Sequence, residues 1–178
     1  MSGIGNYKDA AKALRWIIEL LNEMRGRGAN IQGERVKLDI KYWARIEEHD
    51  DDCGTVCCIM GRAALDKRFR KLGISLKSDD EGSQSERKFA KLAEDVRKAD
   101  TTEYLSIHYN GDVSFGAVKS FWRILPASAV MYMFDNDYYK NSKSVAEAVR
   151  HVTKVLNICE DKSLDDEEKN LKLRKLVG

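Results

Sequence analysis

Proline, long apolar runs and surplus charge are all scarce in this chain of 178 residues. Pro126 is the single proline, and the 12 glycines fall mostly where turns are expected, which favours helices joined by short loops. No apolar run approaches the roughly 20 residues that span a bilayer, and the N-terminal segment lacks the apolar core of a signal peptide. We therefore expect a cytoplasmic protein that makes no membrane contact.

Charge of one sign is not in excess, because 31 Lys and Arg stand against 29 Asp and Glu, for a net charge of +2. No segment places basic residues along one face with aromatic residues between them, as nucleic-acid binding requires. Residues 116–135 have the length of a helix-turn-helix, but their second half offers no Arg, Lys, Asn or Gln to base edges. We therefore do not expect nucleic acid as the partner.

Cysteine is sparse as well. The four cysteines include the adjacent pair Cys57 and Cys58, and they do not resemble the framework of a secreted disulfide-rich domain. Charged residues make up 34% of the chain and hydrophobic ones 43%, as in many helix-rich globular proteins. We expect a single helical domain at residues 1–160, followed by a charged C-terminal helix or tail at 161–178.

The chain is organised around residues 55–72. Gly54 permits a tight turn before them, and the hydroxyl of Thr55 can cap the first amides of a helix. Through the first turns only Arg62 is charged, and a helix that is apolar all round is normally surrounded by other helices. The basic run at 67–71 suits the C-terminal end of a helix dipole. The predicted fold class is mainly α, a compact multi-helix domain around a buried central helix at 55–72.

Capping residues and apolar periodicity predict the remaining helices, and Asn110-Gly111 predicts at most one small β-hairpin, at about 104–115. The Asn-Gly pair supplies the positive φ angles of a tight turn. The alternative is that Asp112 or Ser114 simply caps the next helix, which would make the hairpin very short. The expected helices cover residues 6–24, 38–46, 85–99, 115–124, 126–134 and 144–159.

Three local patterns carry a resemblance to a known group. They are Leu38-Asp39-Ile40 with Trp43, then Cys53-Gly54-Thr55 with Cys57, Gly61 and Ala63, then Phe115-Gly116 with Leu125-Pro126, Ala129 and Phe134. Over residues 38 to about 150 the chain resembles a group of bacterial and phage proteins that carry a C-G-T-x-x-C-x-x-G signature. That group has no assigned activity. The resemblance therefore implies the domain layout and a microbial or mobile-element origin only.

A metal site is one interpretation of His49, Cys53 and Cys57. One imidazole and two thiolates are ligands that zinc accepts. A structural zinc site needs a fourth ligand, which His108 or Cys159 would have to supply from elsewhere in the chain. The alternative is that buried thiols act as small hydrophobic side chains. Because the ligand set is incomplete, the sequence predicts no metal and no cofactor.

Cysteine catalysis is a second interpretation of the same segment. A thiol just before a helix, as Cys53 is expected to be, has a lowered pKa, although the carboxylates in the same turn would raise it. A cysteine nucleophile also needs a base that is oriented by a third group. His49, His108 and His151 are available, but no spacing selects one of them. No catalytic residue is therefore predicted, and a cysteine- or zinc-dependent enzyme remains the alternative function.

Four residues are candidates for contact with a partner. Arg62 aligns with Asp66 and Arg70 at four-residue spacing, which favours a helix edge that reaches solvent, with partner contact as the functional interpretation. Tyr138 and Tyr139 form an aromatic pair that suits either a protein contact or a cover over the core. With no catalytic or cofactor signature, the sequence predicts a non-enzymatic protein that binds another macromolecule, with a protein as the expected partner, in a phage or bacterial accessory role.

Overall fold

The computed structural model describes residues 3–25, 29–31, 34–38, 44–47, 55–78, 83–99, 101–134 and 144–177. Helices hold most of the regular structure, so the predicted mainly α fold class is confirmed. The helices are α1 (Tyr7–Glu23), α2 (Ile59–Leu65), α3 (Lys67–Lys71), α4 (Glu86–Lys98), α5 (Ser114–Phe121), α6 (Ala127–Phe134), α7 (Val145–Glu160) and α8 (Asp166–Arg174), followed by a 3-10 turn at Lys175–Val177. The strands are β1 (Ala29–Ile31), β2 (Glu34–Leu38), β3 (Ala44–Glu47), β4 (Thr55–Cys57), β5 (Ser75–Lys77), β6 (Ser83–Gln84), β7 (Thr102–Tyr109) and β8 (Asp112–Val113).

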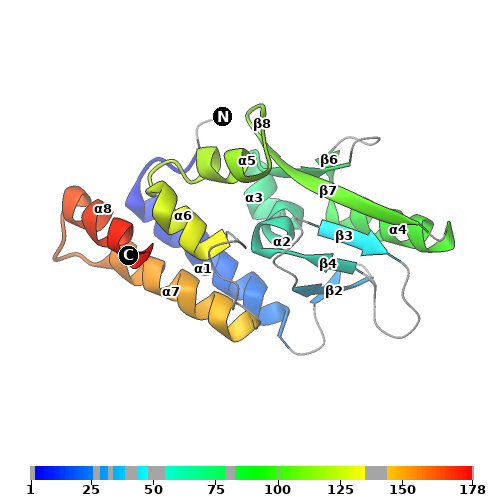
Figure 1. Ribbon diagram of the computed structural model, residues 1–178, viewed down its shortest axis with the longest axis horizontal. Helices are drawn as coiled ribbons and strands as arrows, with labels where there is room; N and C mark the ends of the chain where they lie inside the picture. Colours follow the sequence, from blue (N-terminus) through cyan, green and yellow to red (C-terminus); the bar gives the residue numbers. More distant parts are fainter. Residues whose placement is uncertain are drawn as a thin grey trace.

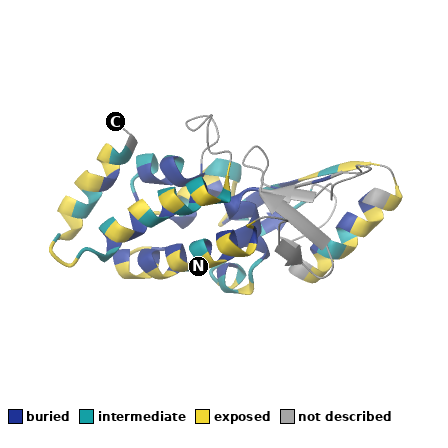
Figure 2. Ribbon diagram, turned by 90° about the horizontal axis from the view of Figure 1, so that it is seen from below, coloured by how far each residue is buried: buried dark blue, intermediate teal, exposed yellow. Residues whose placement is uncertain are grey.

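The elements gather into two regions that meet at α2 and α3 (Figure 1). Helices α1, α6, α7 and α8 lie together at one end, where α1 packs along α7. The strands lie at the other end, and α4 packs on β3 and β7. Buried and exposed residues alternate along the helices at the first end, as in amphipathic helices that share one core (Figure 2). One contiguous apolar core runs through both regions.

Within the described residues the strands form one sheet in the order β1-β2-β4-β3-β7-β5-β6, with β8 paired to β7. Only β2 and β4 run parallel; the other pairs are antiparallel. Strand β7 pairs with β3 through its first half and with β5 through its second, so it joins the two ends of the sheet. Its residues Leu105, Ile107 and Tyr109 are buried and alternate with more exposed ones, so one face of the strand covers the core.

The hairpin predicted at about 104–115 is present, because β7 and β8 are joined by Asn110 and Gly111 with φ angles of 53° and 92°. The sheet extends well beyond this hairpin, which corrects the expectation of at most one. Leu38 ends β2 and residues 44–47 form β3, so the helix predicted at 38–46 is wrong at both of its ends. Periodicity cannot separate short apolar strands from helix turns, and β3 pairs with β7, which lies far away in the sequence.

The buried segment at 55–72 starts as a strand rather than as a helix. Residues 55–57 form β4, and α2 begins at Ile59, so Thr55 is not a helix cap. The N-cap of α2 is Cys58, whose Sγ accepts a hydrogen bond from the N–H of Gly61 at 3.2 Å. Every residue of α2 is buried, as predicted for the central helix.

Asp66 divides what was expected to be one helix. It ends α2 and also caps α3, since its Oδ1 accepts the N–H of Arg68 at 2.8 Å. Short polar side chains favour such caps over helix interiors. The basic run therefore lies in a second short helix, in which Lys67 holds the first position. A helix dipole disfavours a cation there, so the dipole does not explain Lys67.

Three of the other predicted helices, at 6–24, 85–99 and 144–159, begin with a capping side chain. Asn6 caps α1 through the N–H of Asp9 at 2.8 Å, and the hydroxyl of Ser144 accepts the N–H of Glu147 at 3.3 Å at the start of α7. Ser85 precedes α4 and accepts from Lys88 at 3.4 Å. Among the described helices, none combines the length and the apolar character needed to cross a bilayer.

Candidate functional site

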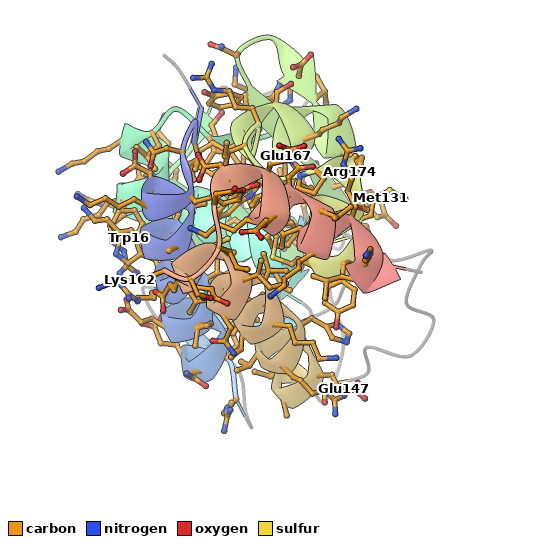
Figure 3. All side chains as sticks on the ribbon, turned by 90° about the vertical axis from the view of Figure 1, so that its left-hand side faces the viewer. Trp16, Met131, Glu147, Lys162, Glu167 and Arg174 are labelled. Atoms are coloured by element: carbon orange, nitrogen blue, oxygen red, sulfur yellow. The ribbon has the colours of Figure 1, made fainter. Side chains whose placement is uncertain are left out.

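A stripe of polar residues around one tryptophan runs along α1. Its members recur at three- and four-residue intervals, which places them on one side of a helix. We call Asp9, Lys12, Trp16, Glu19 and Glu23 the α1 stripe. Trp16 is half-buried and projects from α1 on one side of the helical region, opposite Met131 and Glu147 (Figure 3).

The C-terminal half of the α1 stripe is occupied by cations from α2 and α3. Arg62 Nη2 donates to Glu23 Oε2 at 3.1 Å, and Arg68 Nη1 donates to Glu19 Oε2 at 2.5 Å. Arg68 is also held by Asp66, with Nε on Oδ1 at 3.0 Å and Nη2 on Oδ2 at 3.1 Å. These contacts fix the short helices of the central segment against α1.

Trp16 is the centre of a cluster that also contains Lys12, Arg68 and Phe69, which we call the Trp16 cluster. The guanidinium carbon of Arg68 lies 5.3 Å from the centroid of its ring, and Lys12 Nζ lies 5.2 Å from it. Both distances fall within the range of cation–π attraction. An edge contact with Phe69, with ring centroids 5.7 Å apart, ties the indole to the apolar core. The indole is therefore rigidly placed while its cationic neighbours lie at the surface.

The N-terminal half of the α1 stripe opens onto a pocket of about 180 Å³. The described residues that line it are mostly apolar, with one carboxylate and one ammonium group. They are Gly3, Ile4, Asp9, Lys12, Ala13, Trp16 and Leu72. Among these residues there is no imidazole, thiol or hydroxyl, and Asp9 and Lys12 supply the two charged groups, so the pocket offers shape, charge and an aromatic wall.

The segment before α1 closes one side of the pocket because it is hydrogen-bonded to the end of α5. Ile4 N–H donates to the carbonyl of Phe121 at 2.8 Å, and Ile124 N–H donates to the carbonyl of Ile4 at 3.1 Å. A Cβ at Gly3 would lie 2.7 Å from the carbonyl oxygens of Ser120 and Phe121. Only glycine permits this close approach of two backbones.

Asp66 and Arg68 hold each other in their ionised forms. The hydrogen bond to Asp66 raises the pKa of Arg68 above its ordinary value. Burial acts to raise the pKa of Asp66, but the hydrogen bonds from Arg68 outweigh it and leave that pKa below its usual range. Arg68 therefore remains a cation over the indole at all ordinary pH values.

The structure places the predicted contact residue Arg62 inside the protein, since its side chain is 7% exposed and bound to Glu23. The expected solvent-facing edge is wrong, because Arg62 is buried. Asp66 is hydrogen-bonded to Arg68. Arg70 is half-buried on α3. Tyr138 and Tyr139 lie outside the described residues. A partner-binding role for these four residues stays a prediction.

The metal and cysteine hypotheses fall mainly outside the described part of the chain, which includes neither His49 nor Cys53. The backbone of Cys57 belongs to β4. Among the described residues no three His, Cys, Asp or Glu side chains are grouped so as to hold a metal ion. The cysteine at the start of the helix is Cys58 and not Cys53, so the dipole argument for Cys53 loses its basis.

Sequence reasoning missed the Trp16 cluster. The periodicity that predicts a helix at 6–24 gave Trp16 no role. The available signal was the recurrence of charged residues around one aromatic residue at helical spacing, from Asp9 to Glu23. The contribution of Arg68 and Leu72 could not be read from the same pattern, because they reach α1 only through tertiary packing.

No family model, no curated protein and no solved structure matches this chain, so its function has to be argued from its own geometry.

Proposed function

We propose that this protein acts without catalysis, by binding another protein through the surface around Trp16. The observation that carries this proposal is the pocket itself, which combines apolar walls, a fixed indole and the charged groups of Asp9 and Lys12, with Arg68 over the ring of the indole. Aromatic anchors flanked by charged groups are typical of protein interfaces, where Trp and Arg contribute much of the binding energy.

The arrangement of side chains around Trp16 supports binding more than catalysis. Trp16 is fixed by Phe69 and Arg68, so little side-chain freedom is lost when a partner covers it. Lys12 lies exposed at the rim, where a charge influences the association rate and the choice of partner.

The proposal is tested by placing a photo-crosslinking amino acid at position 12 and irradiating cells in which the chain occurs naturally. We expect one protein species to be captured there, and the same label at the exposed α8 residue Glu167 to capture none of it. Peptide mapping should place the crosslinked partner against α1 and Leu72.

A substitution at Trp16 tests whether capture depends on this surface in a protein that is still folded. Trp16→Ala should reduce the captured amount by about tenfold, as expected for an interface anchor. Circular dichroism checks that this variant is folded. Equal capture from positions 12 and 167, or none at either, would overturn the proposal.

The predicted origin in a phage or another mobile element, and the alternative of a cysteine- or zinc-dependent enzyme, both stay predictions. Zinc analysis of the untagged protein tests the enzyme alternative, for which stoichiometric zinc lost on mutation of Cys53 is the expected result.

A further inference from the structure

We infer that the face of the sheet that points away from the core binds single-stranded RNA. This inference goes beyond the proposed function and does not depend on the surface around Trp16, because α1 and the strands lie in different regions of the molecule (Figure 1). Three features of the face carry it: an exposed aromatic residue, the sign of the charges in register with that residue, and the polar groups beside it.

The two faces of β7 differ in burial. On the face that covers the core, Tyr109 meets Phe121 of α5 edge-on, with ring centroids 5.3 Å apart. The opposite face carries Tyr104, Ser106 and His108, and we call it the outer face. Tyr104 is 57% exposed there, and none of the outer-face residues whose side chains the structure describes is buried. The core therefore does not account for this tyrosine.

The described helices that pack on β7 lie on its core side. Helix α4 contacts β3 and β7, and its residues Phe89 and Ala93 are fully buried in the same apolar core as Ile46 of β3. Ile46 and Arg45 are neighbours in β3, so they belong to opposite faces of the sheet. An extended ligand can therefore reach Tyr104 without displacing α4 or α5.

Backbone pairing places basic residues in the same row of the sheet as Tyr104. Tyr104 is in register with Arg45 of β3. The row continues through β4 to Lys37 of β2. Residues in one row share a face of a pleated sheet, and with strands about 4.8 Å apart this row extends about 14 Å. The outer face therefore has two basic positions on one side of Tyr104.

A third basic residue flanks Tyr104 from the other edge of β7. Lys77 of β5 is in register with Ser106, which makes it a diagonal neighbour of Tyr104. Diagonal neighbours lie about 7–8 Å apart, within reach of a long side chain. Glu47, in register with Thr102, is the one acidic residue at an outer-face position of the described strands. Cations outnumber acids on this face, as a phosphate chain requires.

The polar groups beside Tyr104 favour RNA over DNA. Ser106 and His108 follow Tyr104 along the outer face, and Ser75 of β5 is in register with His108. Hydroxyl and imidazole groups can exchange hydrogen bonds with the ribose 2′-hydroxyl, the group that distinguishes RNA from DNA. Sheets that bind single-stranded RNA stack its bases on aromatic residues of one face, with cations along the phosphate chain.

No single segment of the chain shows this pattern. The basic residues come from β2, β3 and β5 and the aromatic residue from β7, so only strand pairing brings them together. The expectation against nucleic acid considered each segment by itself. An acidic protein would match the charges equally well, but it would give the exposed ring of Tyr104 no specific role, whereas a base stacks on that ring.

The test measures the fluorescence anisotropy of a fluorescein-labelled RNA of twelve nucleotides, without internal base pairing, titrated with the full chain. We expect saturable binding that weakens as the salt concentration rises, because phosphate contacts release counterions. A DNA strand of the same sequence should bind several-fold more weakly, since it lacks the 2′-hydroxyl.

Protein variants locate the site. Tyr104→Ala should weaken binding about tenfold and Tyr104→Phe should leave it unchanged, because stacking needs the ring and not its hydroxyl. Lys77→Gln should weaken binding and lower the slope of log affinity against log salt by about 0.7, the value for one phosphate of a single strand. Lys154→Gln, at an exposed position on α7, should change neither. Circular dichroism checks that each variant is folded.

The inference is overturned if the RNA does not bind, if folded Tyr104→Ala and Lys77→Gln bind it like the parent protein, or if the DNA strand binds as tightly. Tighter binding of a twelve-residue glutamate peptide than of the RNA at the same salt concentration would assign the outer face to an acidic protein instead. None of these results bears on crosslinking from position 12, which tests the surface around Trp16 separately.

Discussion

At the scale of single residues, Arg68 has the largest number of roles at the candidate site. It binds Asp66 on its own helix and Glu19 on α1, and it lies over the ring of Trp16. Its long side chain thus links the central segment to α1 and also positions the indole. A lysine could not make the paired contact with Asp66, because that contact needs the planar fork of a guanidinium.

Arg68→Ala should lower the free energy of unfolding by about 1–3 kcal/mol, since it removes the two side-chain hydrogen bonds that the carboxylate of Asp66 accepts. Urea unfolding followed by circular dichroism measures the change. Arg87→Ala, at an exposed position on α4, is the matched control and should change stability by less than about 0.5 kcal/mol. Equal effects of the two variants would show that the Asp66 contact contributes no stability.

The contribution of Asp66 should depend on pH. Its pKa is lower in the folded chain than the ordinary value of 3.8, so it stabilises the fold fully above that value and loses the effect as the pH falls through the folded pKa. Asp66→Asn should therefore be less stable than the parent protein at pH 7. The difference should shrink steadily below about pH 4 in urea titrations. A difference that is constant from pH 7 to pH 2.5 would contradict this assignment.

At the scale of elements, short segments are fixed by backbone contacts that a single side chain can disrupt. The residues before α1 pair with the end of α5 and form one wall of the pocket. Gly3 is the point of closest approach, because a Cβ there would meet two carbonyl oxygens at 2.7 Å.

Gly3→Ala should displace this segment and lower stability by about 1 kcal/mol or more, because backbone atoms cannot yield as a flexible side chain can. The amide of Ile4, which donates to Phe121, should then exchange with deuterium markedly faster. Gly116→Ala, where an added Cβ meets only one side-chain atom at 3.9 Å, is the control. Unchanged protection of Ile4 would show that the N-terminal segment is not held as described.

At the scale of the whole molecule, α8 closes the helical region over the thiol of Cys159. Leu173 is the buried residue of this helix, whose other residues are polar or exposed. Helix α8 packs on α6 and α7 (Figure 3). Burial raises the pKa of Cys159 to about 12, so its thiol is unreactive at neutral pH while α8 is in place.

Leu173→Ala should cost about 2–4 kcal/mol of stability and make Cys159 react with iodoacetamide several-fold faster, as read from the alkylated peptide by mass spectrometry. Leu171→Ala on the same helix is the control, because Leu171 is 55% exposed. Slow alkylation in both variants would mean that α8 does not control access to this thiol.

The sequence by itself determined the features that depend on neighbouring residues. Helix starts at Asn6, Ser85 and Ser144 can be predicted locally, because a capping side chain accepts a hydrogen bond from a backbone N–H three residues later. Asn110-Gly111 fixes a hairpin because the turn needs two positive φ angles.

Tertiary structure alone decided the strand at 44–47, the burial of Arg62 and the pocket, because each of them depends on partners far away in the chain. Residues 44–47 become a strand because they lie between β4 and β7, and Arg62 is buried because Glu23 meets it from α1. The pocket beside Trp16 arises in the same way, since its walls come from the N-terminal segment, α1 and Leu72. Local patterns carry no information about which distant surfaces bury the most apolar area together, and that choice created the candidate site.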